Sequence, residues 1–238
     1  MTRRTDDRPM IIPSGSRSPS VRRAVCVPAD TPSYLIDRFL SRKTRPADRP
    51  PFVRLYRRGE TAIVTRFIGA PLAVMNLESL IASGAQEIVF LGFCGSLSPR
   101  LPMLSAVSPL QAVSQEGTSR HYFVRRRNFR PHAGLRKRLE DSLRCRGLPF
   151  VQGTVVTTDA PFRETASWLA EMKKRGAAAV DMELAAVFAL AEYRSVRAAA
   201  LMIVSDEVHS ETWTRAFRRP EFEATVERYF LPFLDQSD

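Results

Sequence analysis

Three acidic residues interrupt the most apolar part of the sequence, and their positions suggest that they take part in chemistry. Asp181 and Glu183 open an apolar segment that continues to Ala191, and Asp206 follows an apolar run that ends at Val204. A carboxylate is costly to bury unless it is paired or hydrogen-bonded. Acids in a first helical turn also complement the helix dipole, so Asp181 or Glu183 taken singly could be structural. The joint placement of the three acids favours a site.

The segment between these acids predicts a buried helix followed by a buried strand. From Met182 to Ala191 the sequence places apolar residues around the whole circumference of a helix. The run from Ala198 to Val204 is continuously apolar and short, as in interior strands. The acids would then lie at a helix N-terminus and just past a strand C-terminus, one crossover apart. Ligands bind outside the carboxyl ends of such strands, so this spacing predicts a ligand crevice.

The same residues resemble a known family. Val-Asp-Met-Glu before an alanine-rich helix, followed by Val-Ser-Asp, resembles the nucleoside phosphorylases, which include uridine phosphorylases, purine nucleoside phosphorylases and related nucleosidases. The resemblance implies that Met182 and Glu183 grip the ribose, while Asp206 protonates the leaving purine. Breaking a ribose–base bond builds positive charge on the sugar and negative charge on the base. A carboxylate beneath the ribose and an acid near the base match these two charges.

A second segment resembles the family's strand and turn that carry an aromatic residue against the base. Here the turn is Thr-Thr-Asp-Ala-Pro-Phe-Arg-Glu, residues 157–164, after a strand expected over residues 150–156. The resemblance gives Phe162 the role of contacting the base. Arg163 and Glu164 could hydrogen-bond a base edge, or they could begin the next helix.

Two loops add further candidates for substrate binding. Gly95 belongs to a glycine turn, residues 92–97, which is expected to follow a strand over residues 87–91. This turn resembles the family's Arg-x-Gly-Ser/Thr-x-Gly motif. The polar segment 116–122 contains His121, which could line a site in a neighbouring subunit or lie in a loop with capping hydroxyls.

The positions that bind phosphate in relatives hold unsuitable residues. Ser33 and Phe90 stand where the family has arginines, and Phe93 stands where it has a hydroxyl. Aromatic rings cannot donate hydrogen bonds to an oxyanion. Arg66 could supply a replacement cation, or it could be an ordinary surface arginine. We therefore expect phosphate as the acceptor only slightly ahead of water. A binding relative without turnover is the further alternative, although a retained proton donor argues against it.

Length and pattern indicate one α/β domain. The 238 residues suffice for one substantial core, and strand and helix patterns alternate. Residues 1–20 are rich in Arg, Ser and Pro and are expected to be disordered, leaving a domain over residues 21–238. The resemblance covers about residues 23–235. It implies a single-domain three-layer sandwich with a central mixed, partly barrel-like sheet flanked by helices. It also implies a homo-oligomer built from dimers, with a hexamer as one form.

The formal net charge of +11 does not by itself predict nucleic-acid binding. Of the 36 basic residues 32 are arginines, mostly scattered as pairs, and no nucleic-acid motif accompanies them. The three histidines lack metal-ligand spacing, so we expect neither a structural zinc nor any cofactor beyond phosphate as a co-substrate. We find no signal peptide and no apolar run of membrane-spanning length. Three widely spaced cysteines fit reduced thiols in a cytoplasm.

Overall fold

A computed structural model describes residues 11–13, 21–28, 54–209, 213–217 and 219–234. The strands are β1 (Arg23–Val27), β2 (Arg54–Arg58), β3 (Thr61–Thr65), β4 (Glu87–Ser96), β5 (Ala106–Ser114), β6 (Asn128–Phe129), β7 (Val151–Thr157), β8 (Ala177–Asp181), β9 (Arg197–Glu207) and β10 (Thr214–Arg215). The helices are α2 (Ala70–Ala82), α3 (Ala133–Cys145), α4 (Ala166–Lys174), α5 (Leu184–Tyr193) and α6 (Pro220–Leu234), with short 3₁₀ helices η1 (Thr118–His121) and η2 (Pro161–Arg163).

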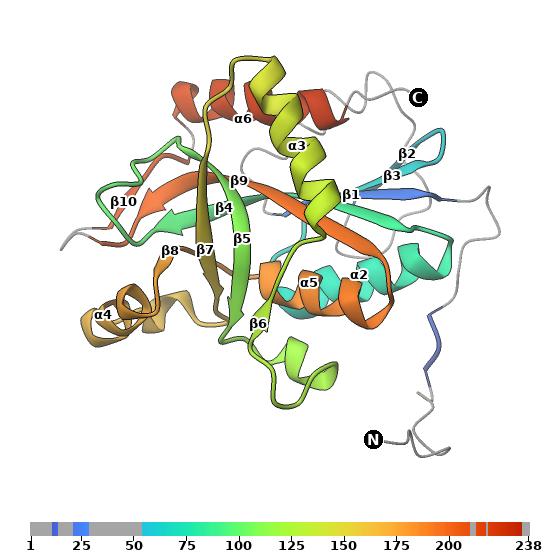
Figure 1. Cartoon of the computed structure of the whole chain (residues 1–238), viewed down its shortest axis with the longest axis horizontal. Coiled ribbons are helices and arrows are strands. Elements are labelled where there is room, and N and C mark those ends of the chain that lie inside the picture. The colour runs from blue at the N-terminus through green and yellow to red at the C-terminus, as the bar shows by residue number, and fades with distance from the viewer. Residues whose placement is uncertain (1–10, 14–20, 29–53, 210–212, 218, 235–238) are drawn as a thin grey trace.

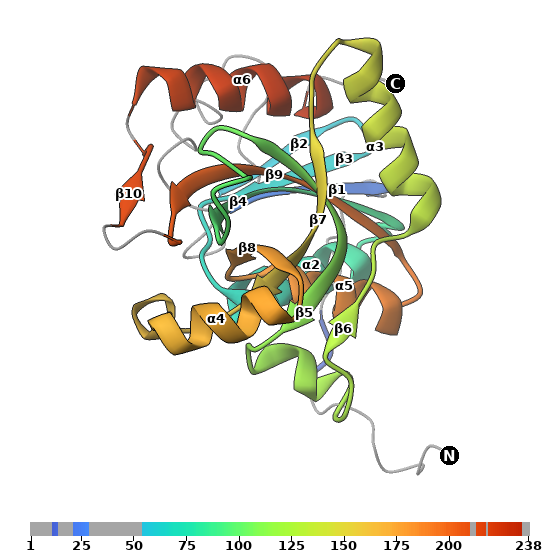
Figure 2. The same cartoon turned by 60° about the vertical axis from the view of Figure 1, so that its left-hand side comes forward.

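These strands form one mixed sheet that closes on itself in part. The strand order is β10-β9-β5-β7-β8-β4-β1-β3-β2, and β9 also pairs with β4. The extra pairing makes a ring of β9, β5, β7, β8 and β4, from which β1, β3 and β2 extend as an open sheet (Figures 1 and 2). The expectation of a mixed, partly barrel-like sheet flanked by helices is confirmed.

Helices cover both faces of the sheet, and the strands bury side chains toward each in alternation. Along β1, Ala24 and Cys26 face the cluster that contains α2 and α5, whereas Val25 and Val27 face the cluster that contains α3 and α6. Figure 1 shows these two helix pairs on opposite sides of the strands. All residues from Leu184 to Ala191 are buried, which confirms the prediction of a helix without a polar face, although α5 begins at Leu184 and not at Met182.

Two strands are longer than the sequence indicated. The prediction of a turn over residues 92–97 is wrong for residues 92–96, because β4 continues through Gly92 and Gly95 to Ser96. Likewise β9 continues to Glu207, so Asp206 lies within the strand and not after it. The parallel pairing of β4 with β9 accounts for both extensions, since it persists from Glu87 and Arg197 to the ends of both strands.

One strand was missed by the sequence analysis, and two expectations fall on residues that the structure does not describe. The strand β8 was not anticipated, because Ala177–Asp181 reads as the approach to the helix. The apolar residues Leu35, Phe39 and Leu40 predict a helix over residues 33–42, which lies outside the described residues. The disorder expected over residues 1–20 also falls largely outside them. In the described part of the chain, no helix is both long and apolar enough to cross a membrane.

Candidate active site

A cavity of about 560 Å³ lies at the last residues of β4, β8 and β9. This volume falls within the range of small-molecule sites, about 300–1,000 Å³. Strand β10 and helix α4 lie on the same side of the molecule (Figure 2). The lining brings together residues from segments far apart in the sequence: Pro28, Ile68, Phe93, Cys94, Gly95, Pro161, Phe162, Glu164, Val180, Asp181, Met182, Glu183, Ser205, Asp206, Val208, Trp213 and Phe217.

Asp181 is the last residue of β8 and holds the start of α5. Its carboxylate accepts hydrogen bonds from the Thr157 hydroxyl at 2.6 Å and from the backbone N–H groups of Glu183 at 3.0 Å and Leu184 at 2.7 Å. Burial raises the pKa of Asp181, and these hydrogen bonds oppose that shift. Most of the acceptor capacity of Asp181 therefore serves the helix N-terminus, although the residue also lines the cavity.

Glu183 lies directly before α5 and is equally buried, with 5% of its surface exposed. Its Oε1 accepts a hydrogen bond at 2.5 Å from the backbone N–H of Gly69. Gly69 has φ 89°, in the region that favours glycine, and it precedes the first turn of α2. Burial raises the pKa of Glu183, and the neighbouring Asp181 raises it further. Glu183 therefore keeps more free acceptor capacity toward the cavity than Asp181 does.

Asp206 enters the cavity from β9. Its Oδ1 accepts a hydrogen bond from the Ser205 hydroxyl at 2.6 Å, and its Oδ2 accepts one from Trp213 Nε1 at 2.8 Å. A side chain at Gly95 would place Cβ 3.1 Å from Asp206 Oδ2 and 2.8 Å from Val208 Cγ2. Glycine at position 95 thus leaves the space that the Asp206 carboxylate occupies.

The turn after β7 supplies an aromatic ring and a second acid. Phe162 is 94% exposed, yet it lines the cavity together with Glu164. Burial raises the pKa of Glu164 to about 7, and the negative charge of Asp206 contributes to the shift. Of the described residues, none donates a hydrogen bond to the Glu164 carboxyl group. Glu164 and Asp206 therefore form a pair of acids at one part of the cavity.

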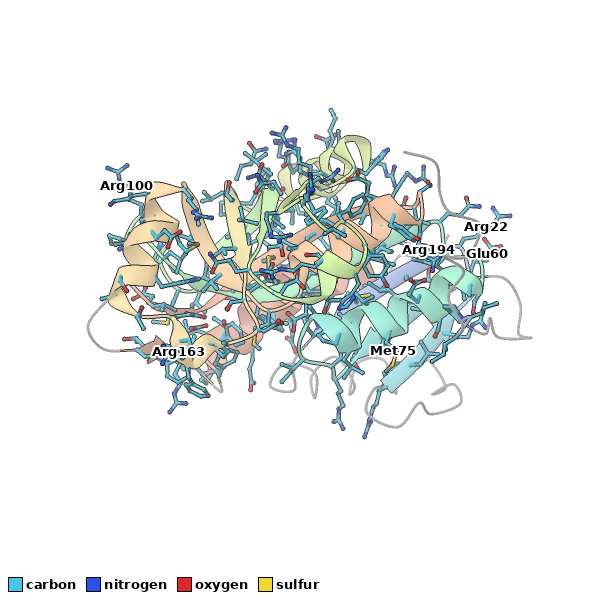
Figure 3. The ribbon with its side chains drawn as sticks, turned by 90° about the horizontal axis from the view of Figure 1, so that it is seen from below. Arg22, Glu60, Met75, Arg100, Arg163 and Arg194 are labelled. Atoms are coloured by element: carbon cyan, nitrogen blue, oxygen red, sulfur yellow. The ribbon has the colours of Figure 1, made fainter. Side chains whose placement is uncertain are left out.

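The structure places three other candidates outside the cavity lining. His121 is exposed at the end of η1, and Arg163 is exposed at the outer edge of the molecule (Figure 3). Arg66 directly follows β3 with φ 64°, two residues before the lining residue Ile68. Their roles in substrate or phosphate binding stay predictions.

The two phenylalanines at the expected phosphate positions take different places. Phe90 is fully buried in the core beside α2 and α5. Phe93 lines the cavity with 8% of its surface exposed, and its ring packs against Phe222 at 5.6 Å and Phe230 at 5.5 Å between centroids. No arginine, lysine or histidine occurs among the described residues that line the cavity. No group of acids, cysteines and histidines in the described chain is arranged to hold a metal ion.

Several lining residues carried no signal in the sequence. Trp213 and Phe217 follow Asp206 at a distance, and only the antiparallel pairing of β10 with the end of β9 brings them back to the cavity. In that register Arg215 lies opposite Asp206. In the sequence, the only sign that Trp213 contributes to the site is that an aromatic residue follows Asp206 within seven positions.

Comparisons with known proteins agree with this geometry. The model of the phosphorylase superfamily matches residues 37–231. The DeoD-type purine nucleoside phosphorylase of Bacillus cytotoxicus is 26% identical over 180 residues, covering 74% of this chain and 76% of the relative. The crystal structure of purine nucleoside phosphorylase from Toxoplasma gondii, in complex with immucillin-H, shares the fold with a TM-score of 0.79, 20% identity and 93% of each chain covered. AMP nucleosidase from Bacteroides thetaiotaomicron shares it with a TM-score of 0.71, 16% identity and 91% of each chain covered.

Proposed function

Because the chain belongs to the phosphorylase superfamily, we propose that it cleaves the N-glycosidic bond of a nucleoside. One observation carries the proposal. Glu183 at the head of α5 and Asp206 near the end of β9 line the same cavity, with Met182 beside them. These are the residues whose sequence context resembles the family's ribose and base contacts.

The proposed reaction breaks the bond between C1′ of the sugar and a nitrogen of the base. The bonding electrons leave with the base, which takes up a proton from Asp206, and C1′ bonds to an oxygen of the acceptor. Hydroxyls of the sugar would donate hydrogen bonds to Glu183, and the positive charge that develops on the sugar favours the anionic form of this carboxyl group. Met182 would form an apolar contact with the ribose.

The base would lie between the turn after β7 and the segment around β10. Phe162, Trp213 and Phe217 line this part of the cavity and offer aromatic surface to a planar ring. Glu164 would hydrogen-bond the edge of the base, because its carboxyl group faces the cavity without a protein donor. We propose the contact with the base edge for Glu164 alone, because Arg163 is exposed and is not among the residues that line the cavity.

The acceptor takes one of two forms. Phosphate is the co-substrate that membership in a phosphorylase superfamily supports, and Arg66 is the candidate cation. Water is a second candidate because Phe93 fills space at the site and because four acids line the cavity without a described cation. Such a cavity repels an anion, so the arrangement favours a neutral nucleophile.

A product analysis tests the proposal and separates these forms. The purified protein is incubated with a panel of purine and pyrimidine nucleosides, with and without phosphate, and both products are identified. Release of free base supports cleavage, and no release from any nucleoside refutes it. Pentose 1-phosphate formed only with phosphate establishes phosphorolysis, and Arg66→Ala should then abolish it. Free ribose formed at equal rates in both conditions establishes hydrolysis.

We further propose a homo-oligomer built from dimers, including a hexamer, in the cytoplasm, with no organic cofactor and no specific nucleic acid as partner. The family resemblance supports the assembly, and the free cysteines Cys26, Cys94 and Cys145 fit a reducing compartment. Light scattering after size exclusion would measure the mass of the assembly. A monomer at micromolar concentration would contradict it.

A further inference from the structure

Trp213 makes a contact with the candidate proton donor that neither the motif nor the family resemblance anticipates. Its indole N–H donates to Asp206 Oδ2 at 2.8 Å, while the Ser205 hydroxyl donates to Oδ1 at 2.6 Å. An indole N–H can only donate, and a carboxylate has about four lone-pair positions in all. Both oxygens of Asp206 are thus fixed in direction, and each retains a lone-pair position, one of which would hold the proton that is donated to the base.

The backbone builds this contact from two short stretches of chain. Strand β10 pairs antiparallel with β9, placing Thr214 opposite Glu207 and Arg215 opposite Asp206. Trp213 lies one residue before this ladder, and the Arg215 guanidinium lies over its ring at 4.9 Å from the centroid. The pairing and the cation–π contact together hold the indole at the cavity.

The exposure of the indole indicates more than a structural contact. Trp213 is 53% exposed although it lines the cavity, and Phe162 from the turn after β7 is exposed at the same cavity. Large aromatic rings left open in a cavity provide stacking surface for a planar ligand. A residue needed only to join β10 to β9 would not have to present its ring there.

We propose that Trp213 is a positioning residue that directs the Asp206 carboxyl group toward the leaving base and forms one aromatic wall of the base site. This inference rests on the proposed cleavage of a nucleoside. It adds a role for the indole N–H, which acts through Asp206, and a separate role for the ring, which contacts the base.

Kinetics of matched variants test the first role. Trp213→Phe keeps a ring and removes the N–H donor. Trp168→Phe is the control, because Trp168 also donates its indole N–H to a side-chain oxygen, that of Gln115, but lies outside the cavity. We expect Trp213→Phe to lower kcat by about tenfold, within the roughly 10²–10⁴-fold that a general acid contributes, with little change in KM. The control should leave both constants unchanged.

The leaving group distinguishes positioning from a general loss of structure. 7-Methylguanosine carries a positively charged base that can leave without a proton, so its cleavage should be nearly insensitive to Trp213→Phe. Equal losses on 7-methylguanosine and on inosine would overturn the positioning role, as would an unchanged kcat on both. Thermal unfolding of each variant checks that the chain is folded. If Trp213→Phe fails to fold, Trp213→Leu, which also lacks the N–H donor, is used for the same comparison of the two substrates.

Fluorescence tests the second role without requiring turnover. The chain has two tryptophans, so Trp168→Phe leaves Trp213 as the only one. Addition of the free base hypoxanthine should quench Trp213 saturably, whereas Trp213→Phe, which retains Trp168, should not respond. If calorimetry shows that hypoxanthine binds but the fluorescence of Trp213 does not change, the proposed contact between the Trp213 ring and the base is wrong. If the wild-type protein cleaves no nucleoside, the proposed function is wrong. The titration with hypoxanthine would still show whether Trp213 contacts a bound base, because it does not depend on turnover.

Discussion

Asp181 and Glu183, at the start of α5, are equally buried but differ in the hydrogen bonds that they accept. Asp181 accepts three hydrogen bonds, one from Thr157 and two from the backbone at the start of α5. Glu183 accepts a side-chain hydrogen bond from the backbone N–H of Gly69 and lines the cavity. Sequence position alone assigns both to the same helix terminus. The number of protein donors separates a residue that holds the fold from one that is left available to a ligand.

This difference predicts opposite outcomes for the two amide substitutions. Glu183→Gln should lower turnover by roughly 10²–10³-fold, because an amide cannot support positive charge on the sugar, and should leave the folded state intact. Asp181→Asn should instead lower stability by about 1–3 kcal/mol, because one oxygen acceptor of a buried network is lost. Steady-state kinetics and urea unfolding of both variants measure the two effects. Full turnover by Glu183→Gln would remove this residue from the ribose site.

The raised pKa of Glu183 predicts how stability depends on pH. A buried acid with a raised pKa in the folded state stabilises the fold fully below its ordinary pKa near 4.5, and that contribution is lost as pH rises through the raised value. Glu183→Gln cannot ionise, so the variant escapes this loss. The melting temperature of Glu183→Gln, measured relative to that of the wild type, should therefore increase as pH rises from acid to alkaline. A constant difference across this range would mean that Glu183 does not titrate with folding.

Glu164 predicts a feature of the pH–rate profile. Its pKa of about 7 means that it loses a proton within the neutral range, where a protonated carboxyl group can donate to the base. Because the protonated form donates to the base, kcat/KM of the wild type should fall above about pH 7, and a flat profile there would contradict this role. Glu164→Gln keeps an N–H donor and should remove this limb. The control is Glu171→Gln, an exposed residue of α4 paired with Arg175, which should retain the wild-type profile.

At the scale of elements, the alignment of β4 with β9 sets the site. The pairing changes register between Cys94 and Gly95, after which Gly95 lies opposite Asp206. The glycines that suggested a turn are instead part of the strand, where the absence of a side chain gives room. At Gly92 a Cβ would approach Phe90 Cε1 to 2.4 Å, so this glycine relieves crowding in the core.

Gly95→Ala tests the importance of this alignment. The added methyl group would lie 2.8 Å from Val208 and 3.1 Å from Asp206 Oδ2, so it must displace one of them. We expect a loss of stability of about 1–3 kcal/mol and a larger proportional loss of kcat, because Asp206 moves from its donors. Gly134→Ala, in the first turn of α3, is the control and should leave turnover unchanged. Wild-type kcat in Gly95→Ala would show that the position of Asp206 tolerates this shift.

At the scale of the whole molecule, charge is distributed differently inside and outside the site. The chain carries a formal net charge of +11, whereas Asp181, Glu183, Glu164 and Asp206 line a cavity with no described cationic side chain. Several surface arginines are paired with acids, among them Arg126 with Glu192 and Arg194 with Glu78 (the latter arginine is labelled in Figure 3). The described lining of the candidate active site is therefore acidic, although the chain as a whole is basic.

This separation predicts two different responses to salt. Binding to mixed RNA should be weak and should fall steeply between about 50 and 200 mM salt, because nonspecific binding is driven by the release of counterions. Binding of a free nucleoside in the cavity should change little over the same range. Filter binding for RNA and calorimetry for the nucleoside measure the two. RNA affinity that survives the added salt would indicate a specific nucleic-acid site.

Local sequence patterns predicted the α/β class, the buried helix α5, the interior strand β9 and a candidate site formed by Asp181, Glu183 and Asp206. These follow from local patterns, because a continuous apolar run with isolated carboxylates has few folded solutions. The family resemblance supplied the partly closed sheet and the roles of Met182, Glu183 and Asp206. The remaining features of the site depend on contacts between distant parts of the chain. Only strand pairing extends β4 and β9 and returns Trp213 to Asp206, and only the donors around each carboxyl group distinguish Asp181 from Glu183. Such pairings join residues distant in the chain, so no local pattern records them.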